Sequence, residues 1–431
     1  MNEFHRLEDY AHVGGAVSHS GAIAVDLRHV VYSLSDAVDL VGVDDVGHGK
    51  RVGAMAAYCG DVMGLNEEQS TFLFDLGMLH DIGVSSTSVH GHLVNEFDWS
   101  GSQLHCVVGY NLLCDFAPLS HLALPIRYHH TKWENLVEMS ELDHSVKSQA
   151  NLIFLVDRVD ALAAPYYTDG SLLMHTAEIR RHIQQFSGTF FAPELVEAFL
   201  AASKSEAFWL QLEPRGIQAV LQDMLDLHQA RQATFSELKQ LGEIFSKIVD
   251  AKSPFTAEHS LGVSRMSRYL AERMHVSAEN CDKIEISGLL HDLGKLRVPD
   301  EVLDKPGTLD ENERKIISAH SFETFQVLRH IKGFEEITAW AAYHHEEPDG
   351  TGYPFHVNGR DLPLEARILR VADIFQAMVQ DRPYRKGLDA NEIRIFLEDL
   401  VAKQRAEIEI VAEILADIPK AMAVALAKHQ T

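Results

Sequence analysis

The C-terminal half of the chain holds a series of histidines and aspartates whose types and spacing suit a metal centre. Imidazole and carboxylate ligands without sulfur are typical of iron or manganese sites, and less specifically of zinc or nickel sites. One ion cannot use so many ligands, whereas two ions that share a carboxylate can, and such a pair can clamp both reacting oxygens of an in-line displacement at phosphorus. The series consists of His259, His291, Asp292, His320, His344, His345 and Asp373.

Each of these residues alone would be a weak signal. A single histidine on an apolar helix face is more often a core residue than a ligand, and an isolated His-Asp pair carries little information. The complete ordered series is what predicts a binuclear site.

An internal repeat carries the same series in the N-terminal half. The pair His80-Asp81 follows His48 by 32 residues, which is also the separation of His291-Asp292 from His259. The offset between the two copies is 211 residues through this segment. The repeat predicts a gene duplication and a second candidate metal site formed by His48, His80, Asp81, His105, His129, His130 and Asp157.

The segments that must position these side chains have helical patterns. Apolar residues recur at three-to-four spacing in residues 237–251 and 255–274, and strand signals are weak throughout. We therefore expect an all-α fold with two tandem helical bundle domains, residues 1–230 and 231–431. Ser253-Pro254 is expected to be the N-cap and first residue of the helix that carries His259.

Two motifs give the second copy a family resemblance. "HDLGK" (291–295) and "HHEEPDGTGYP" (344–354) resemble the signature of the HD-GYP subgroup of the HD-superfamily metal phosphohydrolases, over roughly residues 235–431. The resemblance implies an all-helical HD-type fold in each domain and a di-iron or di-manganese site. It also implies phosphodiesterase activity on bacterial cyclic dinucleotides, chiefly cyclic di-GMP and 3′,3′-cyclic GMP-AMP.

The resemblance also assigns roles to the ligand series. His259, His291, Asp292 and Asp373 would bind the first metal ion, and Asp292 would bridge to the second. His320, His344 and His345 would complete the second ion's ligands. Some relatives hold a third ion with a glutamate four residues before the first histidine. Phe255 stands there in this chain, so two divalent ions are expected.

Further side chains are expected to act on the substrate. Lys295 stands four residues after His291, about one helical turn on, and would stabilise charge at phosphorus; the alternative is a solvated surface lysine. Gly352 permits the tight turn before Tyr353, which would contact a nucleotide or phosphate oxygen. Arg382 and Arg385 would bind guanine edges or phosphates, and surface ion pairs are their alternative.

The first copy keeps the ligand positions but not the substrate motifs. Val84 replaces the lysine, "HHTKWENL" (129–136) replaces the Gly-Tyr-Pro loop, and the arginine pair is missing. We expect this domain to retain a metal site without cyclic-dinucleotide recognition, because decay usually removes costly buried ligands. The alternative is a domain kept for packing or regulation.

Composition sets outer limits on the function. The formal net charge is −25, which disfavours binding to duplex nucleic acid. The first residues, "MNEFHRLEDY", predict no signal peptide, and no apolar run predicts a membrane span. A cytoplasmic protein is expected, and its oligomeric state stays open, a homo-oligomer included.

The expected reaction is hydrolysis of a cyclic dinucleotide to the linear 5′-phosphorylated dinucleotide, which would end a second-messenger signal. The tandem architecture and the missing third-metal glutamate slightly favour 3′,3′-cyclic GMP-AMP over cyclic di-GMP. Two alternatives stand beside it. One is a nucleotide-sensing regulatory module, and the other is a phosphomonoesterase or 5′-nucleotidase activity in the N-terminal domain.

Overall fold

The computed structural model describes residues 22–42, 47–226, 231–253, 258–305, 307–381 and 385–427. Their contacts divide the chain into two compact units. Described residues between 38 and 226 form the N-terminal unit. Residues 22–37 group with residues 231–427 in the C-terminal unit, so contacts place the start of the chain with its second half. The domain limits at residues 230 and 231 stay a prediction.

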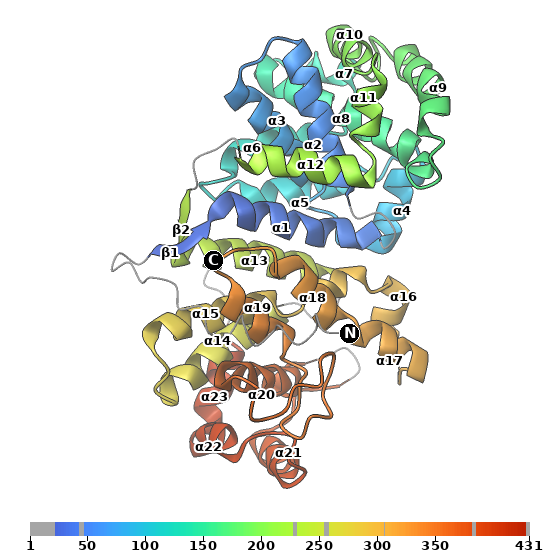
Figure 1. Ribbon diagram of the computed structural model, residues 1–431. Coiled ribbons are helices and arrows are strands. Elements are labelled where there is room, and N and C mark those ends of the chain that lie inside the picture. Colours follow the sequence, from blue (N-terminus) through green and yellow to red (C-terminus); the bar gives the residue numbers. More distant parts are fainter. Residues whose placement is uncertain are drawn as a thin grey trace. The chain divides into compact units, whose positions relative to one another are not determined.

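Helices build the N-terminal unit, as Figure 1 shows. Helix α2 packs against α3 and α8, and α5 packs against α6. The helices are α2 (His48–Val62), α3 (Glu67–Leu79), α4 (Thr87–Asn95), α5 (Gln103–Leu113), α6 (Ser120–Tyr128), α7 (Trp133–Leu136), α8 (His144–Ala163), α9 (Leu172–Gln185), α10 (Pro193–Ala202), α11 (Glu206–Leu210) and α12 (Pro214–Asp226), with short 3₁₀ turns η2 (Leu40–Gly42) and η3 (Ala164–Tyr166).

The C-terminal unit is also helical, with α14 packed against α15 and α20. Its helices are α13 (Phe235–Lys252), α14 (His259–Arg273), α15 (Ala278–Leu290), α16 (Asp300–Leu303), α17 (Glu311–Ser318), α18 (His320–Leu328), α19 (Glu335–Ala342), α20 (Leu364–Val379), α21 (Ala390–Ala402), α22 (Ile408–Ala416) and α23 (Ile418–Ala425), with a 3₁₀ turn η4 (Leu293–Arg297).

The described residues include one two-stranded sheet. Strand β1 (Ala22–Asp26) pairs antiparallel with β2 (Gln232–Thr234), and Ala22 lies opposite Thr234. Helix α1 (Leu27–Asp39) follows β1 and runs from one unit's residues into the other's. The predicted all-α class is confirmed, and the origin of the two units by duplication stays a prediction.

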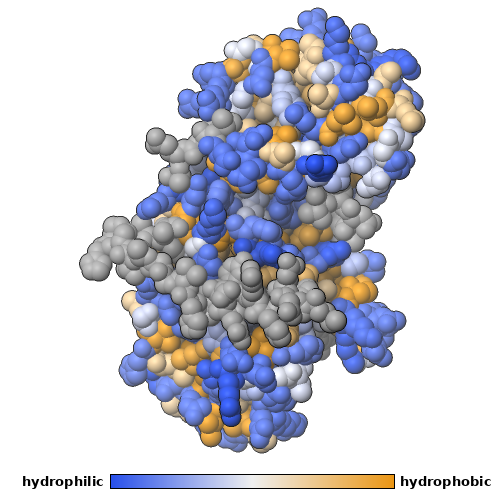
Figure 2. Space-filling model, in the orientation of Figure 1, coloured by the Kyte–Doolittle hydropathy of each residue, from blue (hydrophilic) through white to orange (hydrophobic). Residues whose placement is uncertain are grey.

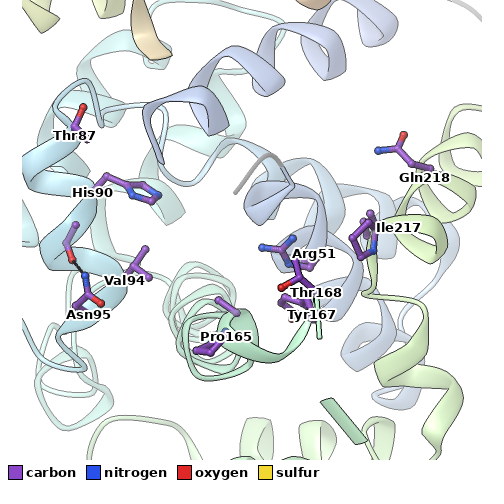
Figure 3. Close-up of a pocket in the computed structure, with 13 residues that line it drawn as sticks. Arg51, Thr87, His90, Val94, Asn95, Pro165, Tyr167, Thr168, Ile217 and Gln218 are labelled. Carbon is purple, nitrogen blue, oxygen red and sulfur yellow. Dashed lines mark hydrogen bonds between the residues drawn. The ribbon is translucent and has the colours of Figure 1, made fainter. Parts of the chain in front are cut away.

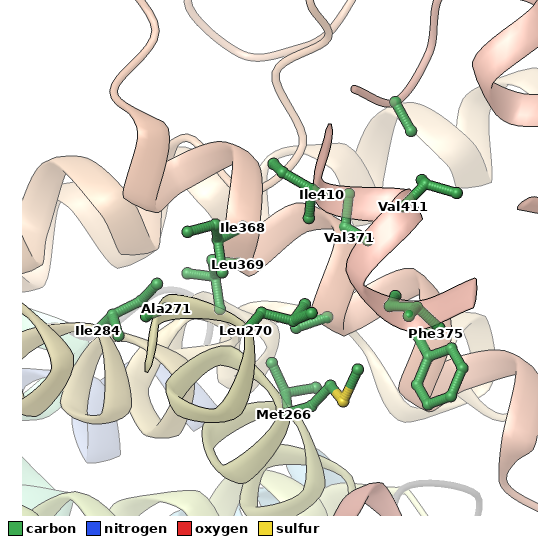
Figure 4. Close-up of a cluster of buried hydrophobic side chains, with 14 of the residues drawn as sticks. Met266, Leu270, Ala271, Ile284, Ile368, Leu369, Val371, Phe375, Ile410 and Val411 are labelled. Atoms are coloured by element: carbon green, nitrogen blue, oxygen red, sulfur yellow. The ribbon is translucent and has the colours of Figure 1, made fainter. Parts of the chain in front are cut away.

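Apolar side chains from α14, α15, α20 and α22 form the core of the C-terminal unit (Figure 4). Met266 and Leu270 of α14 are fully buried, and they belong to one cluster with Ile368 of α20 and Ile410 of α22. This packing fixes α14 and α20, the helices that carry His259 and Asp373. Burial of each such side chain contributes about 1.5–3 kcal/mol of transfer free energy.

The start of α14 differs from the sequence-based expectation. Ser253 is the C-cap of α13, not the N-cap of α14, and its hydroxyl donates to Asp304. Helix α14 begins at His259, while Pro254 lies outside the described residues. The Asp250 carboxylate of α13 accepts from the Ser260 backbone N–H at 3.2 Å, so it satisfies a donor that the new helix leaves unpaired.

The same device occurs in the N-terminal unit. Asp39 accepts from the Gly49 backbone N–H at 3.2 Å, next to His48. Asp39 and Asp250 hold matching places in the sequence repeat, and in both units the carboxylate fixes the turn that presents the first histidine.

The visible surface is mixed in character. Figure 2 shows hydrophilic residues over most of the visible described surface, with hydrophobic ones scattered among them. Among the described helices, none is long and apolar enough to cross a membrane.

Two isoleucines on α22 test the proposed core. Ile410 is fully buried and Ile408 is 62% exposed. Ile410→Ala should lower the free energy of unfolding by about 2–5 kcal/mol, because it leaves a cavity. The control Ile408→Ala should change it by less than about 0.5 kcal/mol. Urea unfolding followed by circular dichroism measures both, and equal effects would contradict this description of the core.

Candidate metal centre

Three candidate ligand histidines of the C-terminal unit lie at helix ends, where backbone carbonyls lack intrahelical partners. His291 follows the last residue of α15, and its Nδ1 lies 2.8 Å from the Gly288 oxygen. His344 lies just beyond α19, with Nδ1 2.6 Å from the Ala341 oxygen. A carbonyl only accepts, so Nδ1 carries the hydrogen and Nε2 is left bare to bind a metal ion.

His320 follows the same rule. It begins α18, and its Nδ1 lies 2.6 Å from the oxygen of Ile317 in α17. The neighbouring backbone therefore sets the ring orientation of all three histidines.

Asp292 lies between two groups of imidazoles. Its Oδ2 lies 3.1 Å from Nε2 of His291 and 3.8 Å from Nε2 of His259. Its Oδ1 lies 3.4 Å from Nε2 of His320 and 3.9 Å from Nε2 of His344. One carboxylate thus faces both groups with different oxygens.

The remaining predicted ligands complete the two groups. Asp373 Oδ1 lies 3.2 Å from Nε2 of His259, and these two residues form a compact group with His291. His345 forms a second compact group with His320 and His344. Within each group, the ligand atoms lie within 4.8 Å of one another. The structure therefore brings all seven side chains of the predicted series together.

Burial and the Asp292 carboxylate act in opposite directions on the imidazoles of the cluster. Burial lowers the pKa of His320 to about 4 and holds the pKa values of His344 and His345 well below the ordinary range. Burial alone would lower the pKa of His291, but Asp292 outweighs it and the pKa is raised. Burial alone would raise the pKa of Asp292, but His291 and Lys295 outweigh it, and the pKa lies well below its ordinary value. Neutral imidazoles and ionised carboxylates are the forms that bind metal ions.

Unpartnered polar atoms show that the cluster fits a divalent cation. His291 Nε2 and Asp292 Oδ1 are buried without a hydrogen-bond partner among the described residues. Buried polar atoms without partners cost free energy, and an ion between the two groups would satisfy both atoms. A set of ordinary core histidines would be satisfied without an ion.

Lys295 lies in a 3₁₀ turn, whereas the sequence predicted an α-helical turn that continues from His291. Helix α15 ends at Leu290, and Lys295 lies in the 3₁₀ turn η4, so no continuous α-helical turn joins it to His291. Its Nζ nevertheless lies 2.5 Å from Asp292 Oδ2. Burial lowers the pKa of Lys295, but Asp292 and Asp373 more than offset this and raise it, so the lysine stays charged.

Glu346 anchors the loop that follows the paired histidines. It is fully buried, and its carboxylate accepts from the backbone N–H groups of Phe355, His356 and Val357 at 2.7–3.2 Å. Gly352 is required at the close approach, because a Cβ there would lie 2.3 Å from the Glu347 nitrogen. The loop therefore folds back onto the end of the ligand segment.

Glu347 ties the same loop to the rest of the unit. Its Oε1 lies 2.8 Å from NH2 of Arg370 on α20 and 2.8 Å from NH2 of Arg405. This pair of glutamates was missed by sequence reasoning, which treated the acidic pair only as part of a motif. Their position directly after two candidate ligands was the available signal.

The predicted substrate contacts have different outcomes. The Tyr353 ring stacks on His345 with centroids 4.8 Å apart, so it lies beside the cluster. Arg385 donates from NH2 to the Ala377 oxygen at 2.5 Å, a contact within the fold. Arg382 and Phe255 lie outside the described residues. Binding of substrate by these side chains stays a prediction.

The N-terminal unit assembles its own cluster. Nδ1 of His80 lies 2.7 Å from the Gly77 oxygen, and Nδ1 of His129 lies 2.7 Å from the Ile126 oxygen, both at helix ends. Asp81 Oδ1 is buried and lacks a hydrogen-bond partner among the described residues. Two compact groups are present: Asp81, His105, His129 and His130, and His48, His80 and Asp81.

Asp157 lies beside His48 of the N-terminal cluster and is paired with Arg158. Its Oδ1 lies 3.5 Å from Nε2 of His48. Arg158 donates to Asp157, with NH2 2.9 Å from Oδ2. Val84 is buried where the other unit has Lys295, so the charge beside the cluster comes from a different element. The structure thus brings the N-terminal series together with altered electrostatics.

The helical fold and the two-group His/Asp cluster define an HD-domain metal phosphohydrolase. A family model described as "HD domain" matches residues 243–400. The chain is 35% identical over 390 residues to the 3'3'-cGAMP-specific phosphodiesterase 1 of Vibrio cholerae, and the match covers 90% of each chain. It therefore belongs to the HD-GYP family of cyclic-dinucleotide phosphodiesterases.

Two further comparisons extend this result. The cyclic di-GMP phosphodiesterase response regulator RpfG of Xanthomonas campestris is 36% identical over 184 residues, which are 41% of this chain and 48% of that protein. The crystal structure of the V. cholerae cyclic GMP-AMP specific phosphodiesterase V-cGAP3 has the same fold. Its TM-score is 0.62 at 24% identity, and the match covers 93% of this chain and 98% of that chain.

Metal content tests the central place of Asp292. Asp292→Ala should remove about two ions per chain, because its two oxygens face both groups, whereas His320→Ala should remove about one. The exposed Glu311→Ala is the control and should keep the parent's content. Elemental analysis of the purified proteins measures this, and parental metal content in Asp292→Ala would refute the assignment.

Proposed function

We propose that the C-terminal unit hydrolyses a cyclic dinucleotide, 3′,3′-cyclic GMP-AMP, cyclic di-GMP or both, to the linear 5′-phosphorylated dinucleotide. The observation that carries this proposal is the placement of Asp292, with Lys295 at one oxygen and imidazoles at both. The reaction would end a second-messenger signal. The proposed compartment is the cytoplasm, because the substrate class is intracellular.

Two divalent ions, iron or manganese, are the proposed cofactors. His259, His291 and Asp373 would hold one ion, His320, His344 and His345 the other, and Asp292 both. When bound, the ions supply Lewis acidity to the phosphate oxygens and lower the pKa of water. The absence of sulfur from both groups favours iron or manganese.

The chain's own residues supply orientation and charge. Lys295 keeps an ammonium group beside the cluster, where it can stabilise charge that develops at phosphorus or on the leaving oxygen. Tyr353 holds its ring against His345, on the loop that Glu346 anchors. Burial of the ligands excludes water from all but the reacting position.

The choice of substrate leans toward 3′,3′-cyclic GMP-AMP. The relative that matches 90% of the chain carries that specificity in its name, whereas RpfG, named for cyclic di-GMP, matches 41%. A regulatory module that binds nucleotides without turnover is the alternative. Complete ligands together with Lys295 favour an enzyme, because a receptor would not need them.

Turnover of three cyclic dinucleotides tests the proposal. The chain is loaded with Fe²⁺ or Mn²⁺ under reducing conditions and assayed with 3′,3′-cyclic GMP-AMP, cyclic di-GMP and cyclic di-AMP. It should linearise 3′,3′-cyclic GMP-AMP, cyclic di-GMP or both. Asp292→Ala should lose at least about 100-fold in kcat/KM, because loss of a side chain that only supports a metal ligand already costs about 10–100-fold and Asp292 is itself a proposed ligand. Tyr353→Ala should keep its metal and fold but lose catalytic efficiency. No turnover by the loaded parent would refute the function.

A second candidate activity belongs to the N-terminal unit. The unit has a cavity of about 640 Å³ between α2, α4, η3 and α12, with Arg51, His90, Tyr167 and Thr168 on its walls (Figure 3). Arg51 donates to Asp160, which meets His48 of the cluster. The cavity and the metal ligands together suit a smaller phosphate ester. We propose removal of the 5′-phosphate from the linear product.

The variant His80→Ala/Asp81→Ala separates this activity from ring opening. Both products of the full chain are followed over time by chromatography. Ring opening should persist while dephosphorylation stops. Dephosphorylation at the parent's rate would refute the second activity, and collapse of ring opening together with stability would assign the unit a structural or regulatory role.

A further inference from the structure

His48 is held by a side chain, whereas His80 and His129 of the same unit are held by backbone carbonyls. His48 is the first residue of α2, and a side chain meets its Nδ1. This Nδ1 lies 2.8 Å from Oδ2 of Asp160. An ionised carboxylate only accepts, so Nδ1 carries a hydrogen and Nε2 faces the cluster, 3.3 Å from Nε2 of His80.

Asp160 is itself held rigidly. It is fully buried on α8, and Arg51 donates to it through Nε and NH2 at 2.8 and 3.0 Å. The Tyr167 hydroxyl donates to its Oδ1 at 2.6 Å, and the Arg51 guanidinium lies 4.4 Å from the centre of the Tyr167 ring. Arg51 and Tyr167 together fix the position of the Asp160 carboxylate that accepts from His48.

The C-terminal unit does not use this arrangement. By the sequence repeat, Gly262 occupies the place of Arg51, and Gln376, three residues after Asp373, occupies that of Asp160. A Cβ at Gly262 would lie 2.3 Å from the Gln376 Nε2, so a larger side chain there would have to displace the Gln376 amide. Among the described residues, neither His259 Nδ1 nor Gln376 Oε1 has a hydrogen-bond partner.

A buried Arg–Asp–His network is hard to explain by packing alone. Apolar side chains of the same volume would stabilise a packing domain at least as well as a buried ion pair. A carboxylate behind a metal-binding imidazole, in contrast, fixes its tautomer and orientation and commonly changes metal affinity by 10–100-fold.

We propose that Asp160 is a positioning residue of a metal site in the N-terminal unit, where it orients His48 and is held by Arg51 and Tyr167. The inference rests on the proposal that this unit binds a divalent ion. Arg51 and Tyr167 also line the cavity, so the network connects the walls of the cavity to the metal ligands.

A matched pair of variants tests the role of Asp160. Both are made in the full chain carrying His291→Ala/Asp292→Ala, so that bound metal belongs to the N-terminal unit. Arg51→Leu/Asp160→Asn and Arg51→Leu/Asp160→Leu remove the same charges and have similar volumes. Only the asparagine can accept from Nδ1 of His48.

Cobalt(II) is the probe, with affinity measured by competition against a chelator and geometry by visible absorption. The Co²⁺ affinity of the asparagine variant should lie within about threefold of that of the parent protein that keeps Arg51 and Asp160. The leucine variant should bind Co²⁺ about 10–100-fold more weakly and show an altered spectrum. Equal affinities and spectra would overturn the inference. No cobalt binding by the background protein would instead refute the proposed N-terminal metal site.

Circular dichroism melting shows whether both variants fold. A second measurement uses the background protein without changes at positions 51 and 160, loaded with Zn²⁺ and labelled with ¹⁵N-histidine. The signals of His48, assigned by their loss in His48→Gln, should show a protonated Nδ1 and a metal-bound Nε2. A metal-bound Nδ1 would overturn the inference even if the leucine variant failed to fold.

Discussion

The hydrogen bond from an imidazole Nδ1 to a carbonyl at a helix end is the interaction on which both clusters depend. A helix leaves its last carbonyls without partners, and a histidine placed there satisfies one of them. The bond fixes the ring and its tautomer together, so Nε2 points away from the helix. His80 and His129 in one unit, and His291 and His344 in the other, use it in the same way. Convergence of several helix ends then places bare nitrogens a few ångströms apart.

Placing several carboxylates among buried imidazoles costs desolvation free energy, and the two units offset this cost with different cations. The C-terminal unit sets a lysine against the aspartate between the two groups. The N-terminal unit has a valine there and sets Arg158 against Asp157 and Arg51 against Asp160. Each ion pair offsets part of the desolvation cost of the carboxylate. Because the cations stand on different sides of the two clusters, the units would present different electrostatic faces to a phosphate.

Sequence reasoning was strongest where one residue type recurs at fixed spacing. The histidine series and the helical periodicity predicted the fold class and the side chains that the structure gathers. It was wrong about Ser253, because a Ser-Pro pair is typical of a helix start and the capping carboxylate, Asp250, comes from the preceding helix. The β1–β2 pair joins segments more than 200 residues apart, and no local pattern indicates such a contact.

Other features depend on tertiary proximity. Asp160 and Arg51 each lie three residues after a predicted ligand, which places them one turn on along α8 and α2. That spacing was a usable signal, but their mutual contact spans 109 residues. The backbone route of Lys295 was also not readable, because a 3₁₀ turn and an α-helical turn bring a side chain to nearly the same place.

The bond between Glu346 and the backbone of residues 355–357 closes residues 346–355 into a ring. The ring begins beside the candidate ligand His345 and contains Tyr353, and the hydrogen bonds of one side chain fix its length. A loop of this kind cannot lengthen or shorten by a residue without giving up its closing bonds. Variation among substrates would then have to arise from side chains on a loop of constant length. If this loop selects the substrate, its selectivity would change by substitution, whereas in an open loop it could also change by insertion.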